Sequence, residues 1–201
     1  MTRRRAVFSV VLALAVALVP VFAGDVSRQQ ADSFAKKVAI INQRAAAPAT
    51  AAASHRTIVS ENEVNSWFAY RGQELIPKGV TEPKVTIIGN GRVMGVATVD
   101  LDAVSKKNAS GGTFDLWKLV GGRVPVAVTG VLQTKGGRGQ FDLQNATLSG
   151  VPVPKALLQE LVSYYSRTAD HPDGVRLDES FALPARIQQI EVGQGQAVVV
   201  Q

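Results

Sequence analysis

The middle of the chain alternates between apolar and other residues on either side of a short turn-forming stretch. The run from Lys84 to Ile88 leads into Gly89-Asn90-Gly91, and Gly and Asn tolerate the positive φ angles of a tight hairpin turn. Residues two apart share one face of a strand. On the return segment one such face carries Val93, Gly95, Ala97, Val99 and Leu101. This alternation predicts a long antiparallel hairpin over residues 84–101.

Two more hairpins follow the first. One has a glycine-rich turn at Lys135–Gly139, and its apolar positions are Val124, Val126, Val128, Gly130, Leu132, Phe141 and Leu143. The other closes the chain, with a turn at Gly193-Gln194-Gly195 before the run Ala197–Val200. Successive hairpins of this kind predict an antiparallel meander.

Helical patterns stand between the hairpins. Ser60 and Glu63 have the spacing of a capping box, in which each residue bonds a free backbone N–H of the other. Pro154 suits the first position of a second helix, which extends to about Arg167. The sequence therefore predicts an α+β fold, a curved antiparallel meander of long hairpins with two helices packed on it.

The first 23 residues have the three-part layout of a secretory signal peptide. Arg3, Arg4 and Arg5 precede an apolar run from Ala6 to Val19, and Val21-Phe22-Ala23 provides a cleavage site before Gly24. The apolar run is shorter than the ~20 residues that span a bilayer, which favours cleavage over an uncleaved membrane anchor. We therefore expect a periplasmic or secreted protein.

Three parts follow the predicted signal peptide. Residues 24–44 carry apolar side chains at helical spacing and predict an amphipathic helix. Residues 45–56 are rich in alanine around Pro48 and predict a linker, and residues 57–201 predict a single α+β domain. Three placements stay open for the helix: packed on the domain, lying on a membrane surface, or partly disordered.

Composition excludes several classes of protein. The chain has no cysteine, so we expect no disulfide, no lipid attachment at a lipobox cysteine, no zinc–thiolate site and no thiol catalysis. The formal net charge is +6, and the three arginines of the predicted signal peptide account for half of it. The remaining excess of positive charge is small and spread along the chain, so we expect no nucleic-acid partner.

No set of residues matches an enzyme signature, and we expect a non-catalytic protein with no cofactor and no metal. His171 lies in an Asp-His-Pro-Asp stretch typical of a polar turn, and His55 lies at the edge of the linker. Asp100 and Asp102 share one face of a predicted strand. A hydrolase would require these carboxylates and His171 to meet in one cleft.

The strongest candidate for a binding surface is an apolar stripe on the predicted second helix and the segment before it. Such a stripe either packs into the core or covers a site for an apolar ligand. Under the second interpretation the ligand-binding residues are Val151, Val153, Leu157, Leu158, Leu161, Val162 and Tyr165.

The order of these elements is characteristic. A helix opens with Ser60–Asn65, long hairpins follow, Gly150–Pro154 leads into an apolar helix, and Leu183-Pro184 precedes the final hairpin. From Thr57 onward this order resembles that of the LmeA-type bacterial envelope proteins, which are exported, bind phospholipid and are compared with tubular lipid-binding domains. The resemblance implies an exported, non-catalytic envelope protein that holds a phospholipid or other apolar small molecule between sheet and helices, with the membrane surface as a further partner. The alternative is an envelope structural or assembly factor that acts through protein–protein contacts.

Overall fold

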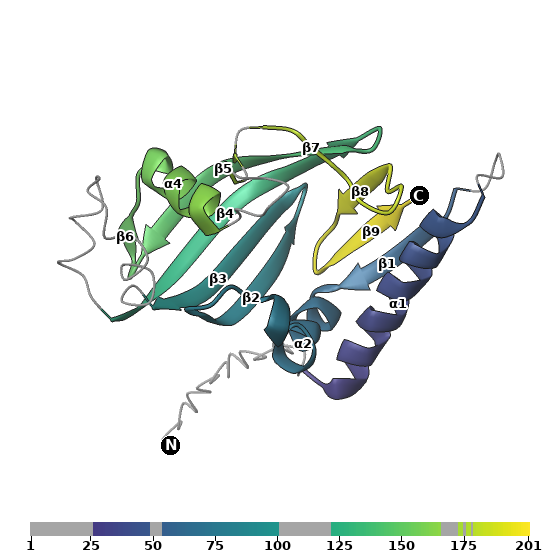
Figure 1. Cartoon of the computed structure of the whole chain (residues 1–201), viewed down its shortest axis with the longest axis horizontal. Helices are drawn as coiled ribbons and strands as arrows, with labels where there is room; N and C mark the ends of the chain where they lie inside the picture. Colours follow the sequence, from purple (N-terminus) through teal and green to yellow (C-terminus); the bar gives the residue numbers. More distant parts are fainter. Residues whose placement is uncertain (1–25, 49–53, 101–121, 166–172, 175, 178) are drawn as a thin grey trace, which may run out of the picture.

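The computed structural model describes residues 26–48, 54–100, 122–165, 173–174, 176–177 and 179–201, which form two antiparallel sheets and their helices (Figure 1). The helices are α1 (Arg28–Ala46), α2 (Glu61–Tyr70) and α4 (Lys155–Tyr165), with a 3-10 turn η1 at Gln73–Leu75. The predicted α+β class is confirmed. The predicted signal peptide, Asp102 and His171 lie outside the described residues.

The larger sheet contains the first two predicted hairpins. Its strands lie in the order β2 (Val80–Gly89), β3 (Arg92–Asp100), β4 (Arg123–Lys135), β5 (Arg138–Leu148) and β6 (Val151–Pro152), and β7 (Phe181–Ala182) pairs with the start of β5. All of these pairs are antiparallel. In the turn between β2 and β3, Asn90 and Gly91 have φ angles of 53° and 79°, as the turn pattern predicted.

The smaller sheet joins two distant parts of the chain. β1 (Arg56–Ser60) pairs with β9 (Gln196–Val200), which forms the predicted third hairpin with β8 (Gln189–Val192). The Thr134 hydroxyl of β4 donates to the Ile190 carbonyl at 2.9 Å and accepts from the Ile190 N–H at 2.7 Å. This pair of bonds fixes the smaller sheet against the turn end of the larger one (Figure 1).

Helix α1 packs on α2, which is one of the three placements left open by its sequence. The Phe34 and Trp67 rings meet edge to face with centroids 5.7 Å apart, and Ala31 is fully buried. The helix begins four residues later and ends two residues later than the predicted range 24–44. Its start is set by Ser27, which caps the first turn by accepting from the Gln30 N–H at 3.2 Å. The predicted linker is correspondingly shorter, because β1 already begins at Arg56.

A buried carboxylate joins α1, α2 and β1. Glu63 completes the predicted capping box with Ser60, and its side chain also accepts from the Ser33 hydroxyl at 2.6 Å and the Lys37 ammonium at 2.7 Å. Burial raises the pKa of Glu63, but the bonds from Lys37, Ser33 and the Ser60 backbone lower it by more, so the net direction is downward. The ionised carboxylate is therefore the form that holds the helices together.

Helix α2 also covers the outer edge of β2. The Asn65 amide donates to the Val85 carbonyl and accepts from the Val85 N–H, both at 2.8 Å. One turn earlier, the Glu61 carboxylate accepts from the Ile87 N–H at 2.7 Å. An exposed edge strand invites pairing with other chains, and these two side chains occupy its backbone groups instead. This arrangement fixes α2 beside β2 and so defines one wall of the pocket described below.

Candidate functional site

One face of the larger sheet is apolar along its whole length. Directly paired residues of antiparallel strands share a face, so the register determines which side chains lie together. The face that contacts α4, which we call the apolar sheet face, carries Val80, Val85, Ile87, Val93, Ala97, Val99, Val124, Val126, Val128, Leu132, Phe141, Leu143, Ala146 and Leu148. The alternation predicted for these strands is confirmed.

The described residues cover this face incompletely. Within the set just named, Ile87, Val124 and Ala146 are buried, at 6, 6 and 4 % exposure, and the others are half-buried. Gly95 lies near the middle of the face, opposite Val128, and a Cβ added there would have no heavy atom of the described residues within 4 Å. Within the described part of the chain, the centre of the apolar sheet face therefore has small side chains and open space above them.

Each end of the face is closed by other elements. At one end, Leu157 of α4 packs with Val99, Val124 and Leu148, and α4 lies across this corner of the sheet (Figure 1). At the other end, the Phe141 ring lies against Gly130. Beyond it Gly139 faces Phe181, whose ring would be 2.8 Å from an added Cβ. The open stretch around Gly95 thus lies between two covered ends.

The residues predicted to bind a ligand are only partly brought together. Leu157 contacts the sheet, and Leu158 is buried at 6 % exposure. Val153 and Val162 are half-buried, whereas Val151 is 65 % exposed on the short strand β6. The side chains of Leu161 and Tyr165 lie outside the described part of the structure. The strand positions around Gly95 were not among the predicted ligand-binding residues, although they belong to the alternation pattern of the sequence.

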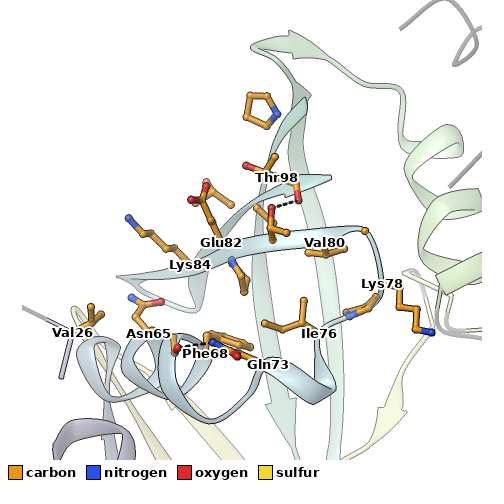
Figure 2. Close-up of a pocket in the computed structure, with 18 residues that line it drawn as sticks. Val26, Asn65, Phe68, Gln73, Ile76, Lys78, Val80, Glu82, Lys84 and Thr98 are labelled. Carbon is orange, nitrogen blue, oxygen red and sulfur yellow. Dashed lines mark hydrogen bonds between the residues drawn. The ribbon is translucent and has the colours of Figure 1, made fainter. Parts of the chain in front are cut away.

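A separate pocket of about 820 Å³ lies beside α2. It is formed by the C-terminal half of α2, the segment around η1, and strands β2 and β3 (Figure 2). Thr98 and Pro125 line it and alternate with Val99 and Val124, so they lie on the face of the sheet opposite α4. The sequence did not predict this pocket, because its lining residues come from α2, the segment around η1, β2 and β3, which are brought together only by the fold.

The described residues contain no group of three or more His, Asp or Glu side chains that could hold a metal ion. Asp100 is paired in register with Arg123 across β3 and β4. His55 is exposed and immediately precedes β1, and its backbone bonds that of Gln201 at 3.0 Å in both directions. Asp100 and His55 are not neighbours in either sheet. Across the same described ranges, no helix is long and apolar enough to cross a membrane.

Comparison with models of known protein families, with curated protein sequences and with solved structures found no match to this chain.

Proposed function

We propose that this protein is an exported, non-catalytic envelope protein that holds a phospholipid or another long apolar molecule on the apolar sheet face, next to α4. The observation that carries this proposal is the half-buried row of aliphatic side chains around Gly95. The described residues leave these side chains half-buried and not enclosed, and accessible apolar surface is typical of binding sites. Sites for apolar ligands are lined mainly by hydrophobic side chains with few polar groups, and the centre of this face has that character.

The direct test is analysis of copurifying lipid. The protein without residues 1–23 is purified under native conditions and extracted with organic solvent, and the extract is analysed by mass spectrometry. We expect a near-stoichiometric acyl lipid. A protein that yields no lipid and does not bind fluorescent phospholipid analogues would rule out the proposal and leave the assembly-factor alternative.

The Gly95→Leu variant locates the ligand. Leucine fits the strand at this position because Gly95 does not have a positive φ and faces open space, and its side chain would occupy the centre of the apolar sheet face. We expect the affinity for a fluorescent phospholipid to fall about tenfold or more, which corresponds to about 1.4 kcal/mol. The measurement is a fluorescence titration.

Thr129→Leu is the matched control for this variant. It adds leucine at a half-buried position on the opposite face of the neighbouring strand, where Thr129 is paired with Met94. Its affinity should equal that of the wild type. Equal affinities of all three proteins would place the ligand elsewhere.

A further inference from the structure

Apolar side chains from three elements contribute to the lining of the pocket beside α2, together with polar ones such as Gln73 and Thr98. Phe68 extends from α2 and Ile76 follows η1, both toward β2, and Val96 comes from β3 (Figure 2). Its volume of about 820 Å³ is within the range of roughly 300–1,000 Å³ found for small-molecule sites. At its border Val26 is 45 % exposed. The interior thus suits an aliphatic chain.

The strand that borders the pocket is irregular at this place. The register of β2 shifts between Thr81 and Lys84, and Glu82 has a φ of 53° immediately before Pro83. A non-glycine residue in the left-handed region is strained, and such strain and bulges concentrate beside functional sites, where they redirect side chains. Here the bulge places Glu82 and Lys84 at the rim of the pocket, on the side of β2 away from α2 (Figure 2).

These two side chains carry opposite charges without neutralising each other. Glu82 and Lys84 are both exposed, and neither has an ion-pair partner within the described ranges of the chain. An ammonium and a carboxylate at one rim complement a headgroup that contains both a phosphate and an amine. A purely anionic headgroup would be attracted by Lys84 but repelled by Glu82.

From the apolar side chains of the interior, the strained bulge and the two rim residues of opposite charge, we propose that this pocket binds a single-chain zwitterionic phospholipid. The acyl chain lies against Phe68, Ile76 and Val96, and the phosphate and amine of the headgroup contact Lys84 and Glu82. Val96, Thr98 and Pro125 of this site lie on the face of the sheet opposite α4, and the proposal does not rest on the function proposed above.

The test compares lysophosphatidylethanolamine with lysophosphatidylglycerol, which lacks the amine. Both are titrated calorimetrically, below their critical micelle concentrations, into the protein that carries Gly95→Leu, so that binding on the apolar sheet face is weakened. We expect lysophosphatidylethanolamine to bind about threefold more tightly, the scale of an exposed charge pair. Glu82→Gln should abolish this preference, and Lys84→Gln should weaken the binding of both lipids.

A blocking variant tests the location. Ala69 lines the pocket at an exposed position of α2, so Ala69→Trp should fill the pocket and remove binding of both lipids by at least about tenfold while the far-UV circular dichroism spectrum is retained. If Ala69→Trp does not fold, the Glu82→Gln comparison decides, because that residue is exposed. Absence of binding, equal affinity for the two lipids, or affinity unaffected by a folded Ala69→Trp variant would each overturn the proposal. If any of these results overturns the proposal for the pocket, loss of copurifying lipid from the Gly95→Leu variant would still support the function proposed for the apolar sheet face.

Discussion

Replacement of Glu63 by alanine is expected to lower the free energy of unfolding by about 3 kcal/mol, the scale of breaking a buried ion pair. The Glu63 side chain is 9 % exposed and accepts bonds from Ser33, Lys37 and the Ser60 backbone. Without the carboxylate these donors lose their partner, and an unsatisfied buried donor costs free energy in addition to the lost bond. Because Glu63 lies in α2 and its donors lie in α1 and β1, the change should loosen all three elements together.

Urea denaturation followed by circular dichroism measures this effect. Glu74→Ala is the matched control, since Glu74 is an exposed glutamate in η1, and it should change stability by less than about 0.5 kcal/mol. Lys37→Ala should cost less than Glu63→Ala, because the Lys37 side chain is 30 % exposed and water can replace part of its interaction. Equal stability of Glu63→Ala and Glu74→Ala would show that the carboxylate does not hold the helices.

The same carboxylate predicts a pH dependence. Folding lowers the pKa of Glu63, so the unfolded chain binds the proton more readily. The stabilising contribution is therefore complete above the unfolded-state pKa of about 4.3 and is lost as the pH falls through the lower folded-state value. The stability difference between wild type and Glu63→Gln should be constant from about pH 7 to pH 5 and should shrink below pH 4. A stability difference between the two proteins that stays constant from about pH 7 to below pH 4 would contradict the lowered pKa of Glu63.

Local patterns in the sequence predicted local structure. The capping box needs only Ser60 and Glu63, and the turn of the first hairpin needs only Asn90 with its flanking glycines, so each is determined within a few residues. The additional partners of Glu63 could not be predicted, because Ser33 and Lys37 lie 30 and 26 residues away. The same applies to Asn65, whose amide bonds the backbone of Val85, 20 residues on.

The candidate site likewise has one part that local sequence predicts and one part that depends on distant residues. Alternation alone predicted which side chains of β3 and β4 share a face, because the period of a strand is two. Whether that face is filled depends on which distant elements lie over it. The predicted ligand-binding residues lie on the helical stripe that includes Leu157, whereas the part of the face left open by the described residues is around Gly95, one register row from Ala97 and Val126. The positive φ of Glu82 likewise has no sequence signal, since glutamate is not a residue that favours it.

Two glycines on the apolar sheet face should respond to alanine in opposite directions. Gly130→Ala is expected to destabilise the protein by about 2 kcal/mol, the scale of overpacking, because the new Cβ would meet the Phe141 ring and would be 2.6 Å from the Asp142 carbonyl oxygen. Gly95→Ala places the same methyl group on the adjacent strand of the same face, in open space. It should stabilise the protein by about 0.5 kcal/mol, since glycine weakens a strand interior through its conformational freedom.

Thermal unfolding of the lipid-free proteins, each compared with the wild type, distinguishes the two effects. A lower melting temperature for Gly130→Ala and an unchanged or higher one for Gly95→Ala would support a sheet face that is closed at Phe141 and open at its centre. If Gly95→Ala is as destabilising as Gly130→Ala, the space over Gly95 is filled in solution, and the proposed lipid site loses its physical basis. Because both variants add the same atoms to one face of one sheet, the sign of the difference reports on the space above each position and not on strand propensity.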